Sequence, residues 1–94
     1  GYEIQLSNTE REGRYPCGSI YGLAPAPLGL HRLNRWNTIE IRSRRSGIEV
    51  YVNGKFAVSH PGLPDRPQTG PIGLQLHDQH SFAMFKNIRI RLIR

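Results

Sequence analysis

Hydrophobic side chains recur at every second position in several short stretches of this chain, separated by Gly, Pro and polar residues. The clearest rows are Tyr2, Ile4 and Leu6; Ile48, Val50 and Val52; Ile72, Leu74 and Leu76; and Ile88, Ile90 and Leu92. Successive side chains of a strand point to opposite faces, so each row predicts a strand with one apolar face. No stretch has the apolar period of a helix over helical length. The pattern predicts an all-β, antiparallel chain of about seven short strands, arranged as a sandwich or barrel.

The middle of the chain predicts a three-stranded meander over residues 36–58. Residues 36–44, 48–52 and 55–58 are its strands, with Asn53-Gly54 between the last two. This dipeptide is a strong hairpin signal, because a type I′ turn needs positive φ at both central residues. The following residues 60–69 contain three prolines and predict a loop that carries the chain from one sheet to another.

Length and composition allow one domain, spanning residues 1–94, with a modest core. No apolar run reaches the ~20 residues of a membrane-spanning helix, so no membrane partner is expected. Cys17 is the single cysteine, which excludes an intrachain disulfide and any zinc site built on several thiolates. No His lies near it in the sequence, which favours a structural thiol over a nucleophile.

Arginine carries most of the positive charge, with eleven Arg against two Lys and a net charge of +6. Clusters such as Arg42, Arg44 and Arg45 would attract anions, including nucleic acid. Apart from Tyr51, however, the exposed positions around them lack the aromatic residues of single-strand binding platforms. The pattern therefore favours a solvated outer face over a nucleic-acid partner.

Polar side chains with ligand-binding chemistry lie opposite two of the apolar rows. Glu3 and Gln5 are on the first predicted strand, and Gln75 and His77 on the penultimate one. If these strands share a sheet, the four side chains line one polar face together with Tyr21. Such groups suit sugar hydroxyls, and a Glu and a His could transfer protons. The alternative is the solvated outer face that antiparallel sheets often show.

Two further features have both a functional and a structural interpretation. Trp36 begins the strand 36–44 and is a candidate sugar-stacking residue, although a large aromatic there also suits packing. The turn His77-Asp78-Gln79-His80 holds two imidazoles and a carboxylate, but a turn does not aim them at one point. A polar turn is the favoured interpretation, and no metal or other cofactor is expected.

Six stretches, in order and at their spacing, resemble one family: residues 1–6, 18–23, 36–42, 52–54, 70–77 and 85–90. They are similar to the C-terminal part of the 3-keto-disaccharide hydrolase domain, which has a concanavalin-A-like (lectin/glucanase) jelly-roll fold. The resemblance implies a β-sandwich that cleaves a glycosidic bond next to a ketone-bearing sugar. It implies a carbohydrate ligand, with Glu3 or His77 transferring protons and with Gln5, Gln75 and Tyr21 orienting hydroxyls.

The chain also departs from this family. The family domain carries further strands before the match to residues 1–6, and Asp78 and Lys86 replace its usual Gly and frequent Arg. We therefore expect a half jelly roll with an open edge and an uncovered apolar face. A second copy would complete the sandwich, as a homodimer or larger assembly. Activity would depend on the completing strands; the alternative is a non-catalytic carbohydrate-binding or assembly module.

Overall fold

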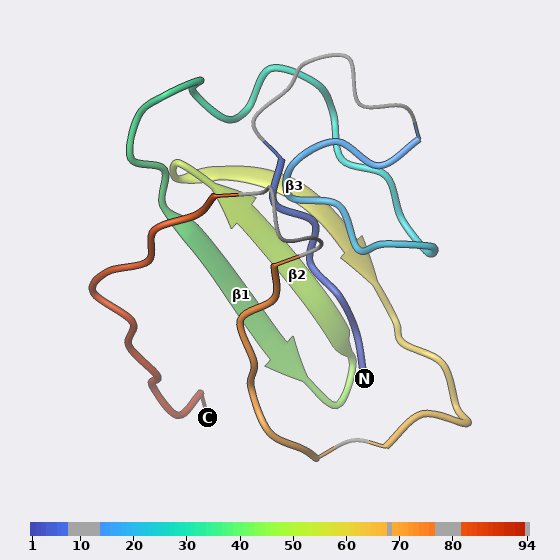
Figure 1. Ribbon diagram of the computed structural model, residues 1–94. Helices are drawn as coiled ribbons and strands as arrows, with labels where there is room; N and C mark the ends of the chain where they lie inside the picture. The colour runs from blue at the N-terminus through green and yellow to red at the C-terminus, as the bar shows by residue number, and fades with distance from the viewer. Residues whose placement is uncertain (8–13, 68, 77–81, 94) are drawn as a thin grey trace.

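The core of the molecule is a three-stranded antiparallel sheet in the order β1-β2-β3 (Figure 1). The computed structural model describes residues 1–7, 14–67, 69–76 and 82–93. Its strands are β1 (Ile39–Arg44), β2 (Gly47–Val52) and β3 (Lys55–His60), and no helix occurs among these residues. The predicted meander and the all-β class are therefore confirmed. It follows that the described residues contain no helix able to cross a membrane.

The turn between β2 and β3 has the conformation that its sequence predicts. Asn53 has φ of 52° and Gly54 has φ of 80°, as a type I′ turn requires. The Asn53 side chain also ties the turn to its surroundings: Oδ1 accepts a hydrogen bond from Thr38 N at 2.9 Å, and Nδ2 donates to Leu30 O at 3.0 Å. These contacts fix the end of the hairpin against the chain that enters β1.

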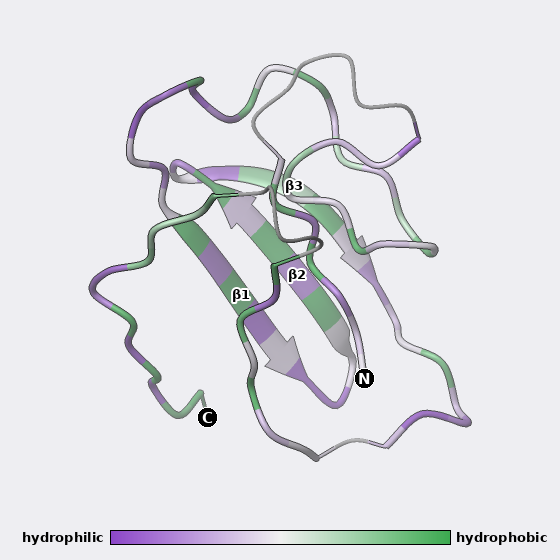
Figure 2. Cartoon of the chain, viewed as in Figure 1, coloured by the Kyte–Doolittle hydropathy of each residue, from purple (hydrophilic) through white to green (hydrophobic). Residues whose placement is uncertain are grey.

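The strand register places apolar residues together on one face of the sheet. Ile39 lies opposite Val52, and Ile41 lies opposite Val50. Val50 and Val52 are completely buried, and the alternation of hydropathy along β1 and β2 is visible in Figure 2. A strand with one buried face needs a second layer over that face, and here irregular chain provides it.

That covering layer comes from the N-terminal third of the chain. Ile20, Ala24 and Ala26 are buried against the valines of β2, and Ile4 packs at the margin of the same cluster. The approach is close: a Cβ built on Gly18 would lie 2.6 Å from Val52 Cγ2, and Gly18 has φ of 94°. Only glycine fits both the contact and the backbone there. The predicted strands over residues 2–6 and 18–23 are reduced to isolated bridges, at Ile4–Ile20 and Ile20–Ala24.

The proline-rich loop after β3 returns to the N-terminal segment. Leu63 N donates a hydrogen bond of 2.7 Å to Tyr2 Oη, and Arg66 donates one of 2.8 Å to the carbonyl of Gly1. The Arg66 guanidinium also lies 4.9 Å from the centre of the Tyr2 ring. The predicted loop thus holds residues 1 and 2 in place through hydrogen bonds and a cation–π contact.

The prediction of strands over residues 70–77 and 85–92 is wrong for the described residues, because 69–76 and 82–93 contain none. No backbone hydrogen bond joins either described segment to the sheet. Nine of their apolar side chains are 38 to 82 % exposed: Ile72, Leu74, Leu76, Phe82, Met84, Phe85, Ile88, Ile90 and Leu92. Strand conformation gains little without a hydrogen-bonded neighbour, which explains why an alternating pattern alone does not produce a strand here.

Candidate functional site

The first chain segment brings three of the candidate residues together. Tyr21 N donates a hydrogen bond of 2.8 Å to Glu3 O, and Gln5 N donates one of 2.9 Å to Ser19 O. Ile4 and Ile20 pair between them and face the core. By the alternation of paired chains, Glu3 and Tyr21 lie on the side away from that core. Ser19, which lies opposite Gln5, is fully buried, so the Gln5 end of this side is partly covered. Glu3 and Tyr21 are exposed, and Gln5 is half-buried.

An additional aromatic residue, Tyr15, joins this group. Its ring centre lies 5.0 Å from that of Tyr21, with the two planes at 51°. Tyr21 remains 51 % exposed, so the ring pair presents an aromatic surface beside a carboxylate and an amide. Sequence reasoning missed Tyr15, because it belongs to none of the predicted strands. We call Glu3, Gln5, Tyr15 and Tyr21 the N-terminal polar face.

The remaining candidates do not join the N-terminal polar face. Gln75 is exposed in a segment without strand structure, and no hydrogen bond links it to Glu3 or Gln5. His77, together with the turn 77–80, lies outside the described residues. Trp36 precedes β1, where Lys86 Nζ lies 4.0 Å from the centre of its ring. The structure therefore assembles Glu3, Gln5 and Tyr21 but gives no common face with Gln75.

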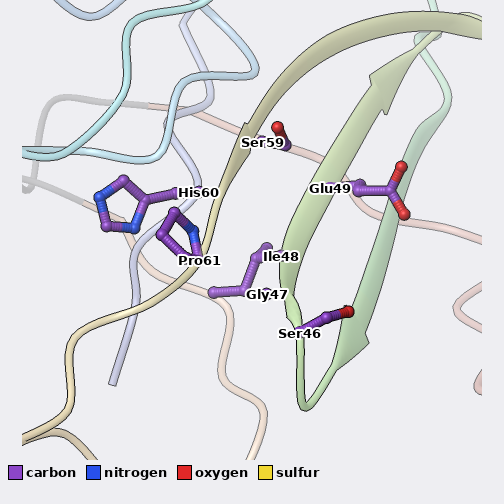
Figure 3. A pocket seen from close by; sticks show the side chains of 7 residues that line it. All are labelled: Ser46, Gly47, Ile48, Glu49, Ser59, His60 and Pro61. Carbon is purple, nitrogen blue, oxygen red and sulfur yellow. The ribbon is translucent and has the colours of Figure 1, made fainter.

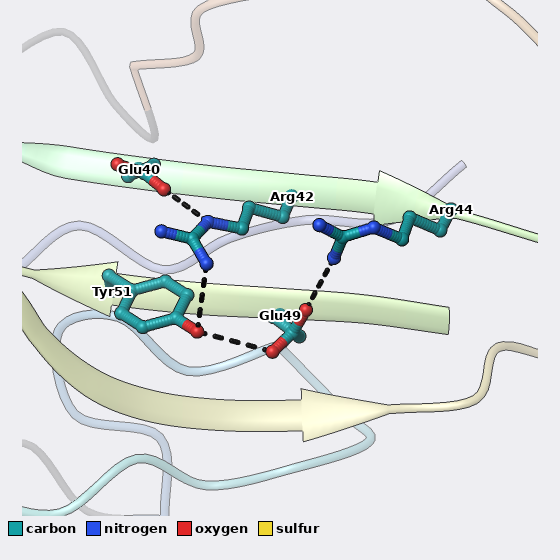
Figure 4. Close-up of polar contacts among 5 residues, drawn as sticks. All are labelled: Glu40, Arg42, Arg44, Glu49 and Tyr51. Atoms are coloured by element: carbon teal, nitrogen blue, oxygen red, sulfur yellow. Dashed lines mark hydrogen bonds and ion pairs between the residues drawn. The ribbon is translucent and has the colours of Figure 1, made fainter. Parts of the chain in front are cut away.

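The outer face of the sheet carries an ionic network (Figure 4). Arg42 binds the carboxylate of Glu40 and also donates to Tyr51 Oη at 3.3 Å, while Arg44 donates to Glu49 at 2.7 Å. The hydrogen bond to Glu40 raises the pKa of the Arg42 guanidinium above its usual range. Both arginines thus have carboxylate partners on a largely exposed face, in agreement with a solvated outer surface.

A cavity of about 320 Å³ lies at the open end of β2 and β3, but its polar groups do not converge (Figure 3). Glu49 points to one side of the sheet and His60 to the other. His60 Nδ1 already accepts a hydrogen bond from Gly62 N at 2.9 Å. An acid and an imidazole on opposite faces cannot act on one bond, so this cavity does not form a two-residue acid–base site.

Other reactive groups are dispersed. Among the residues that the structure describes, no three His, Cys, Asp or Glu side chains gather in a way that could hold a metal ion. Cys17 is buried, and burial raises the pKa of its thiol; a backbone hydrogen bond with Ser7 opposes that effect. A raised pKa makes the thiolate scarce, which fits a structural residue.

Comparison with known proteins identifies one family. No curated protein and no solved structure matches this chain significantly. The model of the 3-keto-alpha-glucoside-1,2-lyase-like domain matches residues 1–91. This match includes the sheet, the N-terminal polar face, residues 69–76 and all but the last two residues of the segment 82–93. The chain therefore belongs to the 3-keto-alpha-glucoside-1,2-lyase-like domain family.

Proposed function

We propose that this protein is a carbohydrate-active domain that cleaves glycosidic bonds in keto-sugar glycosides, and that the N-terminal polar face contacts the sugar. One observation carries the proposal: the backbone ladder between residues 3–5 and 18–21 sets Glu3 opposite Tyr21, beside Gln5. Hydroxyl-rich ligands need acceptors, donors and a ring on which to lie, and this face offers all three. The family match supports the keto-sugar class.

The proposed chemistry uses the acidity that a ketone gives to its neighbouring carbon. A base removes the proton from C2 of a 3-keto-sugar, the C1–C2 double bond forms and the C1–oxygen bond breaks. The departing oxygen takes a proton, and addition of water to the double bond completes hydrolysis. Glu3 and His77 are the proposed proton-transfer groups, and Gln5, Gln75 and Tyr21 orient the hydroxyls. The exposed carboxylate of Glu3 has the access to substrate that this role requires.

The test of this activity is turnover of a 3-keto-glucoside by the purified chain. We expect Glu3→Gln and His77→Ala each to reduce kcat/KM by about a hundredfold or more. Glu40→Gln is the matched control, because Glu40 is also an exposed carboxylate but lies on the ionic outer face. Unchanged turnover in both Glu3→Gln and His77→Ala would refute the assignment.

A second candidate is a non-catalytic carbohydrate-binding or assembly module. Gln75 and the apolar side chains around it are exposed, which favours this candidate. The N-terminal polar face then lacks Gln75, which was predicted to lie beside Glu3 and Gln5. Binding of a keto-glucoside by calorimetry without any turnover would identify this module. Binding lost in Glu3→Gln would still place the ligand on the same face.

For the fold, we propose a single concanavalin-A-like domain, in which the three-stranded sheet is part of an incomplete jelly roll. The proposal rests on the uncovered row Ile72, Leu74 and Leu76, which has the pattern of a sandwich strand without its neighbour. A second copy is the proposed partner. Residues 70–76 contain no charged side chain, so two such segments can pair without repulsion. Residues 86–91 carry Lys86, Arg89 and Arg91, which oppose pairing with themselves.

Light scattering tests the assembly. We expect a dimer at micromolar concentration that Leu74→Lys converts to a monomer, whereas the control Ile90→Lys leaves the dimer intact. A compact monomer of the unchanged protein at that concentration would contradict the proposal.

A further inference from the structure

A second exposed surface surrounds Trp36, on a part of the chain distinct from the N-terminal polar face. Trp36 is the only tryptophan of the protein and is 51 % exposed, although Lys86 Nζ lies 4.0 Å from its ring centre. The exposed part of the indole ring is flat apolar surface on which a ligand can lie. Figure 1 shows that the segment beginning at residue 82 passes close to the chain entering β1.

These two segments enclose an open cleft of about 400 Å³. It is lined by Asn34, Arg35, Trp36, Phe82, Ala83 and Met84. The lining combines an aromatic and apolar floor with one guanidinium, and the Lys86 ammonium stands over the tryptophan ring. A ligand that fits this chemistry has a flat or weakly polar face for the ring and an anionic group for the cations.

The charge balance of the cleft differs from that of the sheet. Arg42 and Arg44 are neutralised by Glu40 and Glu49. No acidic residue lines the cleft, and no described carboxylate forms an ion pair with Arg35 or Lys86. Arg35 in the lining and Lys86 over the Trp36 ring are thus two cations without a carboxylate partner among the described residues, and they favour an anion.

We infer that the Trp36 cleft binds acidic saccharides, with a sugar ring against Trp36 and its carboxylate paired with Lys86 and Arg35. The choice of a saccharide rests on the proposed carbohydrate function. Apolar C–H faces of a sugar pack on an indole, while the charge-assisted hydrogen bonds supply the preference for an acid over a neutral sugar. The substrate class of the protein then includes uronic-acid-bearing glycosides.

Tryptophan fluorescence reports this binding directly, because Trp36 is the only source of the signal. The probe is an oligogalacturonate, and its methyl ester is the matched neutral ligand. We expect saturable quenching by the acid, with affinity roughly tenfold above that for the ester. Lys86→Gln should abolish that preference. The control Arg45→Gln removes an exposed cation from the β1–β2 turn, outside the cleft, and should leave the preference unchanged.

Three results would overturn the inference: equal affinity for acid and ester, a preference unchanged in Lys86→Gln, or tighter binding of a short oligothymidylate than of the oligogalacturonate. The last would identify the cleft as a nucleic-acid site instead. Turnover of a neutral 3-keto-glucoside is measured separately, with Glu3→Gln as its variant. Turnover without acid preference would reject the cleft assignment alone, whereas acid binding without turnover would reject only the proposed activity.

Discussion

The sheet β1–β3 and the C-terminal segments 69–76 and 82–93 carry the same alternation of apolar and polar residues, yet only the sheet is paired and packed (Figure 2). In the sheet, Val50 and Val52 are fully buried. In the C-terminal segments, Leu74 is 56 % exposed and Ile90 79 % exposed. An alternating row therefore defines which face of a strand will be buried, but a neighbouring strand must be present before the strand forms.

The difference lies in where each partner comes from. Strands β1, β2 and β3 are joined by turns of two residues, so each strand pairs with the one that precedes or follows it in the sequence. Short loops have a small closure entropy, which favours such pairing. Residues 70–76 have no adjacent hairpin partner among the described residues and depend on a distant strand or another chain. This dependence is the basis for proposing assembly through that segment.

The largest contrast is expected when a charge is placed in each region. Val50→Asp buries a carboxylate without a partner and should lower the free energy of unfolding by more than about 4 kcal/mol. Leu74→Asp places the same charge on an exposed segment and should change the stability of the monomer by less than about 0.5 kcal/mol. Urea denaturation followed by circular dichroism, at a protein concentration low enough that the unchanged protein is monomeric, measures both. Similar losses in the two variants would show that residues 69–76 are part of the packed core.

An intermediate effect is expected at the hairpin end. Asn53→Ala removes three hydrogen bonds, to Thr38 N, Leu30 O and Asn37 Oδ1, from a residue with positive φ. The expected loss in unfolding free energy is about 2–3 kcal/mol. Asn87 also has positive φ but lies in the exposed C-terminal segment, so Asn87→Ala is the matched control and should cost clearly less. An equal cost at both positions would remove the distinction between the regions.

The smallest effect is expected from Cys17, in the layer that covers the sheet. Burial raises the pKa of this thiol, so the neutral form is favoured in the folded protein. Below the pKa of the unfolded chain, about 8.5, Cys17 should not make stability depend on pH. Above it, unfolded chains lose the proton first, and the free energy of unfolding should fall by at most about 1.4 kcal/mol per pH unit. Thermal unfolding from pH 7 to about pH 9.5 should show a steeper decline than in Cys17→Ala. Parallel declines would mean that the thiol is accessible.

The sequence predicted the local features of this fold well. The Asn53-Gly54 turn and the inward row Ile48, Val50 and Val52 follow from turn chemistry and alternation, which act over a few residues. The layer around Ile20 was less accessible to prediction. It depends on irregular chain between prolines and on the close approach of Gly18 to Val52, and neither has a periodic signature.

In the candidate site, too, local features could be predicted from the sequence and long-range contacts could not. Alternation separates the exposed Glu3 from the partly buried Ile4, and pairing with residues 18–21 brings Tyr21 opposite Glu3. Joining these residues to Gln75 required a long-range strand pairing, for which a single sequence contains no signal. Tyr15 was missed for the corresponding reason, since a loop residue is positioned by tertiary contacts alone.

Hydrogen–deuterium exchange over a range of protein concentrations tests most directly whether residues 72–76 need a partner strand in order to form hydrogen-bonded structure. We predict that amides of the central strand β2 are protected at every concentration, because β2 is hydrogen-bonded to a strand on each side. Amides of residues 72–76 should exchange freely in dilute protein and become protected as the concentration rises. Protection of residues 72–76 at the lowest concentration, where the protein is monomeric, would contradict the account.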